Sequence, residues 1–332
     1  MTEPSEALKP DRKPTREGVE IAATKIAAIL PVTPLLPLKL SDATIWCKAE
    51  CLQPIGAFKL RGAWHRLTDL SEAEQEKGVV AFSSGNHGMG VAWAAKRLKM
   101  PATIVMPSDA PERKLSATRD YGAEVVTYDR RGEDRVATAR KIADEKGAVL
   151  VPSFDDPWII EGQGSTGLEI AVQMIAQCGI SPNRIIVCCG GGGLASGIGL
   201  GLPDVQLTIV EPEGWDDMGW SLAEGRIVPV PQDAPDTICD ALKTIQVSPL
   251  TLEILADRRT TAVSVTDEEV MAAMRYANER LQLVLEPGGA VALAAVLAGK
   301  AEYDDRTVII LTGGNVDPDV YARAMAGPAE AR

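Results

Sequence analysis

The chain has 332 residues, a formal net charge of −12 and a hydrophobic content of 45%. This length predicts about two domains or one large α/β unit, and the composition is typical of a folded globular protein. The negative charge argues against nucleic acid or an anionic membrane as the main partner. The N-terminus shows no apolar leader, no apolar run is long enough to span a membrane, and the six cysteines follow no metal-site spacing. We therefore expect a cytoplasmic protein.

The chain begins with a predicted helix and then alternates between strands and helices. Residues 15–30 have helical spacing, with Thr15 as a cap, and the prolines of residues 31–38 should end that helix. Strands are expected at residues 43–50, 78–84, 102–107, 123–129, 148–153, 184–190, 205–212 and 306–314. Helices are expected at residues 87–99, 111–122, 133–147, 166–179, 194–202, 267–283, 288–299 and 317–327. This alternation predicts an α/β protein with parallel sheets flanked by helices.

Four consecutive glycines, Gly190 to Gly193, lie between a predicted strand and a predicted helix. Glycines let the backbone approach an anion closely, and a helix N-terminus points several N–H groups at it. A tight turn between the two elements would need fewer glycines, so we favour a phosphate-binding loop. The sequence matches neither the dinucleotide-binding fingerprint nor a Walker A loop.

A second polar loop, "FSSGNHGMG" at residues 82–90, follows another strand. Loops at the carboxyl ends of parallel strands are where such sheets bind ligands. The side chains of Ser83, Ser84 and Asn86, with the loop N–H groups, would suit a carboxylate. The alternative is an ordinary capped helix start. We expect His87 to stabilise this loop through a hydrogen bond rather than to act as a base.

An acidic loop at residues 211–219 contains Glu211, Asp216 and Asp217. Their oxygens could bind a hard cation, although a solvated acidic loop explains the residues equally well.

Lys59 lies in the largely apolar stretch "PIGAFKLRGAW". It could be a surface lysine with a buried stem or a partly desolvated amine that attacks carbonyl carbons. A reactive lysine, a phosphate-binding loop and a carboxylate-binding loop in one chain favour the second reading. Together they indicate pyridoxal phosphate acting on an amino acid.

Six motifs then occur in a familiar order: "GAFKLRGA", "SSGNHG", "GGGGL", "EPEGWDD", "EPGGA" and "TGGNVD". In this the chain resembles fold-type II pyridoxal-phosphate enzymes, and in particular the threonine/serine dehydratase and serine racemase family. The resemblance covers nearly the whole chain. It implies a two-domain, tryptophan synthase β-like fold, with residues 1–70 and 156–332 in a large cofactor-binding domain and residues 71–155 in a small domain that closes over the substrate. It also implies a homodimer.

The resemblance implies roles for individual residues. Lys59 would bond covalently to the cofactor and move the α-proton, and Ser84 would be an acid or base on the opposite face. The remaining cofactor contacts would be Phe58, Asn86, Gly190, Gly191, Gly192, Gly193, Leu194, Glu286 and Thr312. The substrate loop would comprise Ser83, Ser84, Gly85, Asn86 and His87. Glu211, Asp217 and the Trp215 carbonyl match the family's site for a divalent cation such as Mg, Mn or Ca.

The implied activity is conversion of a β-hydroxy amino acid to a 2-oxo acid and ammonia. The alternatives are a phenylserine or hydroxyaspartate dehydratase, a serine-type racemase, and a catalytically silent binding protein. Three departures bear on the substrate. Ala57 stands where the family usually has serine or threonine, Thr312 replaces a usual serine, and Trp158 and Glu161 lie in a segment that approaches the substrate side in relatives.

Overall fold

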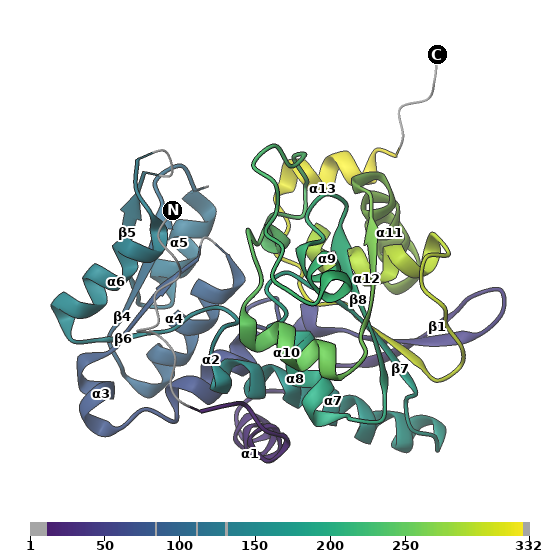
Figure 1. Ribbon diagram of the computed structural model, residues 1–332, viewed down its shortest axis with the longest axis horizontal. Coiled ribbons are helices and arrows are strands. Elements are labelled where there is room, and N and C mark those ends of the chain that lie inside the picture. Colours follow the sequence, from purple (N-terminus) through teal and green to yellow (C-terminus); the bar gives the residue numbers. More distant parts are fainter. Residues whose placement is uncertain (1–11, 84, 111, 130–131, 328–332) are drawn as a thin grey trace.

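The computed structural model describes residues 12–83, 85–110, 112–129 and 132–327, and the described chain contains two β-sheets (Figure 1). The larger sheet has six strands in the order β1-β2-β10-β7-β8-β9. β1 is antiparallel to β2, and the other neighbours are parallel. Its strands are β1 (Leu35–Lys39), β2 (Thr44–Lys48), β7 (Arg184–Cys188), β8 (Gln206–Pro212), β9 (Thr261–Val265) and β10 (Thr307–Ile310).

The smaller sheet has four parallel strands in the order β5-β4-β3-β6 and lies at the left of Figure 1. Its strands are β3 (Val79–Phe82), β4 (Ala102–Pro107), β5 (Glu124–Tyr128) and β6 (Val149–Leu150). Its helices are α3 (Glu72–Lys77), α4 (Asn86–Leu98), α5 (Glu112–Asp120) and α6 (Arg135–Lys146). Apolar strands such as β4, whose six residues are all buried, suit a sheet covered on both faces.

The other helices are α1 (Arg16–Ala27), α2 (Leu60–Leu67), α7 (Pro157–Cys178), α8 (Gly193–Gly201), α9 (Asp217–Glu224), α10 (Pro249–Asp257), α11 (Asp267–Leu281), α12 (Pro287–Leu297) and α13 (Pro318–Met325). Of these, α7, α8, α9, α11 and α12 contact strands of the larger sheet. Two short 3₁₀ turns are η2 (Glu50–Leu52) and η3 (Asp240–Leu242). Helix α7 packs against α1, α2 and α8, while the apolar α12 packs against β7, β8 and β10.

The expected α/β architecture with parallel sheets is confirmed, and Thr15 caps α1 through a hydrogen bond from the Gly18 N–H. Strand β1 was not expected, because Pro37 suggested a break. It is an edge strand, where a proline is tolerated. Helix α7 begins at Pro157, about nine residues earlier than expected, and Asp156 caps it.

Glycines in the first half of α7 explain that difference, because they serve close helix packing rather than a turn. A Cβ on Gly162 would lie 2.5 Å from the Gly62 Cα in α2. On the facing helix α8, a Cβ on Gly197 would lie 2.1 Å from the Ile160 carbonyl oxygen and 2.6 Å from the Gly164 nitrogen. The three helices approach so closely that side chains do not fit between them.

Two chain crossings connect the sheet regions, one between α2 and α3 and one between β6 and α7. The domain boundaries at residues 70–71 and 155–156 fall in these crossings and stay a prediction. Within the described residues, no helix is both long enough and apolar enough to cross a membrane.

Candidate active site

A cavity of about 430 Å³ opens where strands β3, β7 and β10 and the segment after β6 end. Carboxyl ends of parallel strands are the usual ligand site of such sheets. The cavity brings together every described residue predicted to contact cofactor or substrate: Phe58, Lys59, Ser83, Gly85, Asn86, His87, Gly190, Gly191, Gly192, Gly193, Leu194, Glu286 and Thr312. Ser84 lies outside the described residues. Residues about 250 positions apart in the sequence therefore share one site.

Lys59 lies at the base of α2 and points its amine into this cavity. Its Nζ donates a hydrogen bond to the Ser153 carbonyl oxygen at 3.0 Å and lies 5.2 Å from the centre of the Phe58 ring. Burial lowers its pKa to about 8, although Cys188 and Glu286 oppose the shift. A substantial share of the amine is therefore neutral near physiological pH, as covalent bonding to a carbonyl carbon requires.

The segment before Lys59 is joined to the end of β10. The Phe58 N–H donates to the Thr312 carbonyl oxygen at 3.1 Å, and Ala57 forms an isolated β-bridge with Gly313. Ala57 is completely buried and is not among the described residues that line the cavity. The Ala57 methyl group therefore does not face the substrate cavity. Thr312 does line the cavity, and its hydroxyl oxygen lies 3.4 Å from the Cys188 sulfur.

The glycine loop also lines the cavity and leads into α8. A Cβ on Gly191 would lie 2.2 Å from the Phe154 ring, so no larger residue fits there. Gly192 has φ +85°, which other residues rarely adopt, and it is the N-cap of α8. The backbone is therefore exposed to the cavity at a helix N-terminus, as phosphate binding requires.

Asn86 connects the two sheet regions at the edge of the cavity. Its Nδ2 donates to Glu286 Oε1 at 2.6 Å, and its Oδ1 accepts from Asn315 Nδ2 at 2.8 Å. Asn315 also donates to the Ile55 carbonyl oxygen at 2.7 Å. Burial and then Asp240 raise the pKa of Glu286 to about 7. The Asn86 side chain is thus held by neighbours on both of its polar atoms.

His87 stabilises its loop, as expected. Its Nε2 lies 2.9 Å from the Val151 carbonyl oxygen, and only the ring N–H can donate in this pair. Burial and the nearby Lys59 lower its pKa to about 3, so the ring is neutral.

Several cavity residues were not predicted. Ser153 and Phe154 come from the crossing after β6, Lys114 and Arg135 from α5 and α6, and residues 240–244 from η3 and the turn beyond. The last segment carries little sequence pattern, so only its position in the fold reveals it.

The segment that carries Trp158 and Glu161 reaches the cavity through Ser153 and Phe154, but neither Trp158 nor Glu161 is among the described residues that line it. The guanidinium carbons of Arg12 and Arg66 lie 4.7 Å and 4.4 Å from the centre of the Trp158 ring. The buried Glu161 carboxylate accepts hydrogen bonds from both terminal nitrogens of Arg12, each at 2.9 Å, and from the Thr15 N–H at 2.8 Å. These side chains hold the N-terminal segment on α7.

The expected cation residues lie outside the cavity, around the start of α9. Glu211 accepts the N–H groups of Met218 and Gly219 at 3.1 and 2.9 Å. Neither Asp217 oxygen has a well-formed hydrogen bond to a described residue, although the Val247 N–H partly stabilises its charge. Burial raises the pKa of both carboxyls, that of Glu211 with a further contribution from Asp217. The described residues contain no cluster of three or more potential metal-ligating side chains.

A family model described as "Pyridoxal-phosphate dependent enzyme" matches residues 27–313. The chain belongs to this family. The cavity fits the cofactor, because it combines a desolvated lysine amine with a glycine-lined helix N-terminus.

Named relatives narrow the similarity. The chain is 40% identical over 315 residues to an L-threo-3-hydroxyaspartate ammonia-lyase of a Pseudomonas species, covering 92% of this chain and 97% of the relative. It is 36% identical to a serine racemase of Schizosaccharomyces pombe, covering 94% and 98%. Among solved structures, maize serine racemase has a TM-score of 0.86 at 32% identity and covers 95% of this chain and 98% of its own. A threonine deaminase from T.th. has a TM-score of 0.83 at 37% identity, covering 92% and 99%.

Proposed function

We propose that this protein is a pyridoxal-phosphate-dependent ammonia-lyase that converts a β-hydroxy amino acid of the threonine or serine type to a 2-oxo acid and ammonia. The convergence of the Lys59 amine, the glycine loop and the "SSGNHG" loop in one cavity carries the proposal. The named relatives support it, since they are called hydroxyaspartate ammonia-lyase, threonine deaminase and serine racemase.

In this proposal each cavity residue has a defined task. When bound, pyridoxal phosphate supplies the electron sink for the pair left by a broken Cα–H bond. Lys59 Nζ takes that proton, which its lowered pKa permits. The glycine loop holds the phosphate group, and the N–H groups at the start of α4 hold the substrate carboxylate. The substrate loses its β-hydroxyl as water, and a water molecule then releases ammonia, which leaves the 2-oxo acid.

Replacing Lys59 tests this proposal. Lys59→Ala should abolish covalent attachment of the cofactor, which absorbance measures. It should also abolish ammonia release from threonine and serine. Retained ammonia release would overturn it. A chiral assay of recovered substrate separates elimination from racemisation, for which the second acid or base would be Ser84.

The charges at the cavity favour one substrate within this class, an amino acid with a second carboxylate such as 3-hydroxyaspartate. Lys114 and Arg135 both line the cavity. Lys114 is paired with Asp240 at 2.9 Å, whereas Arg135 lies 6.0 Å from the Phe82 ring centre and has no hydrogen bond or ion pair to a described residue. A cationic side chain with free donors suits a β-carboxylate.

Arg135→Met distinguishes the substrates. A charge-assisted hydrogen bond contributes about 1.5–3 kcal/mol, so kcat/KM for 3-hydroxyaspartate should fall about 10- to 100-fold. The value for threonine should stay within about threefold. An equal fall for both substrates would contradict the assignment.

We extend the proposal in three ways. A divalent cation held by Glu211, Asp217 and the Trp215 carbonyl would compensate two buried carboxylates. Closure of residues 71–155 over the substrate would use the two crossings as hinges.

A cytoplasmic homodimer agrees with six free cysteines and with exposed apolar side chains such as Val32 and Val172. Light scattering tests the dimer.

A further inference from the structure

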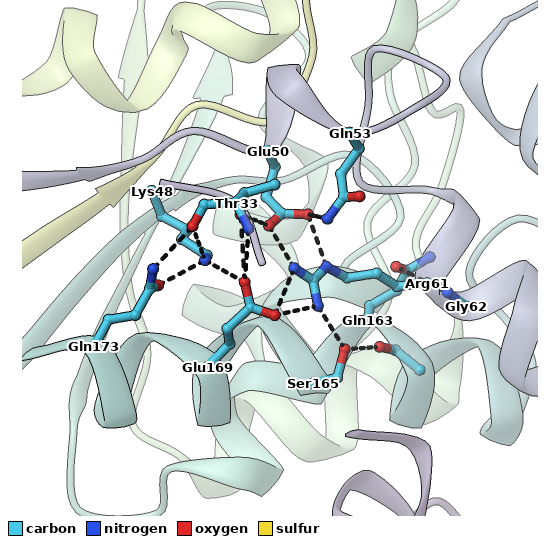
Figure 2. A network of polar contacts seen from close by, with 11 residues as sticks. Thr33, Lys48, Glu50, Gln53, Arg61, Gly62, Gln163, Ser165, Glu169 and Gln173 are labelled. Atoms are coloured by element: carbon cyan, nitrogen blue, oxygen red, sulfur yellow. Dashed lines mark hydrogen bonds and ion pairs between the residues drawn. The ribbon is translucent and has the colours of Figure 1, made fainter. Parts of the chain in front are cut away.

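Figure 2 shows a polar network around Arg61, which lies two residues after Lys59 in the chain. Its centre is Arg61, which is 1% exposed. The Arg61 guanidinium donates to both Glu50 oxygens, from Nε at 2.8 Å and from Nη2 at 2.7 Å. Its Nη1 and Nη2 also donate to Glu169 Oε2, each at 3.1 Å. The side chain therefore joins η2, α2 and α7 at one point.

Lys48 completes the network and balances its charge. Its ammonium group donates to the Thr33 carbonyl oxygen at 2.8 Å, to Glu169 Oε1 at 2.5 Å and to Gln173 Oε1 at 2.7 Å, so all three of its donors are used. Two cations thus face two carboxylates. Such buried networks are seldom needed for stability alone, because apolar side chains of similar volume often replace them without loss. Their directional bonds can instead fix one geometry.

The network bears on Lys59 through the helix start. Lys59 is the N-cap of α2, and Arg61 is the second helical residue. Side chains two positions apart in a helix point to nearly opposite faces. The Lys59 amine accordingly faces the cavity while Arg61 faces α7. Upstream, the Phe58 N–H holds the chain to Thr312. Arg61 is the corresponding anchor downstream.

We propose that Arg61 is a positioning residue for Lys59: its bonds to Glu50 and Glu169 fix the first turn of α2 and so set where the Lys59 amine stands in the cavity. This inference rests on the proposed function, since it assigns Lys59 as the residue that carries the cofactor.

The test compares Arg61→Lys with Arg66→Lys. Lysine keeps the charge but cannot make the forked contacts of a guanidinium. Displacement of a reacting group by about 1 Å can cost up to about 100-fold in rate. For Arg61→Lys we expect kcat to fall about 10- to 100-fold with KM within about twofold. Cofactor attachment to Lys59, trapped with borohydride and followed by mass spectrometry, should slow in parallel.

Arg66→Lys is the matched control, on the same helix and paired with Asp156 at 3.0 Å. It should leave kcat and the attachment rate within about twofold of wild type. An Arg61→Lys protein with reduced thermal stability but normal kcat and attachment would overturn the inference. If that variant does not fold, Glu169→Gln, which spares both Glu50 bonds, should still slow attachment several-fold, and unchanged attachment would be equally contrary. Failure of the wild-type protein to trap cofactor on Lys59 would instead refute the proposed function.

Discussion

Two regions of the molecule each hold a pair of largely buried carboxylates, and their surroundings differ. Glu50 and Glu169 face Arg61 and Lys48. Burial alone would raise the pKa of Glu50, but Arg61 and then Lys48 hold it below its usual value. Glu211 accepts two backbone N–H groups. No lysine or arginine is among the main influences on the pKa of Glu211 or of Asp217. Burial raises the pKa of both.

The comparison shows that burial by itself does not decide how a carboxylate behaves; the nearest opposite charge does. In the Arg61 network the two cations balance the two carboxylates. The largest influences on the pKa of the pair at α9 include no basic side chain, so the cation proposed above would supply its positive charge.

The largest expected effect comes from unbalancing the complete network. Glu50→Gln keeps the shape but leaves the buried cations undercompensated, so the free energy of unfolding should fall by roughly 3 kcal/mol. Chemical denaturation measures it. Glu253→Gln is the control, because Glu253 pairs with Lys13 at an exposed site and such pairs contribute about 0–1 kcal/mol. Similar losses in both variants would remove the distinction between the two regions.

Adding a divalent cation to the pair Glu211 and Asp217 should have the second-largest effect on stability. After chelation, excess Mg, Mn or Ca should raise the free energy of unfolding, by about 2.7 kcal/mol at 100 times the dissociation constant. Thermal unfolding with and without the cation measures the shift. Asp217→Asn should abolish it, since one charged ligand is lost. A shift that persists in Asp217→Asn would place the cation elsewhere.

The smallest expected effect concerns pH. Lys59 has its pKa lowered to about 8, so its amine loses the proton as pH rises through that value. The rate of cofactor attachment should therefore rise with pH and level off above about 8, well below the range of an ordinary lysine. Because the Arg61 network is balanced, Arg61→Lys should slow attachment without moving this midpoint. A midpoint near 10 in wild type would contradict the desolvation of Lys59.

Most of the fold follows from local pattern. Short apolar strands and amphipathic helices predict the parallel sheets, and Thr15 predicts the start of α1. Helix α7 shows the limit, because Gly162 and Gly164 are typical of loops by propensity. Their role becomes clear only when α2 and α8 are seen in contact with them. Tertiary packing overrides local preference there.

The site was predictable where one motif supplies both the residue and its surroundings, as at Lys59 and the glycine loop. Phe154, Lys114 and Arg135 escaped prediction, since each enters the cavity from another element and no local pattern announces it. The Glu50–Arg61 pair escaped for the same reason. Its residues are eleven positions apart, yet Glu169 and Gln173, more than a hundred positions on, complete the network.

The glycine contacts of α7 also limit how this chain can evolve. A single methyl group at Gly162 would collide with α2, and one at Gly197 in α8 would collide with α7. Substitutions on the inner faces of these helices should therefore be tolerated only when both packed residues change together. Substitutions should be tolerated freely on the outer face of α7, where Val172 is 68% exposed and Ile175 is 56% exposed. In a saturation mutagenesis library, tolerance should alternate along α7 with the helical period, as a record of which face touches its neighbours.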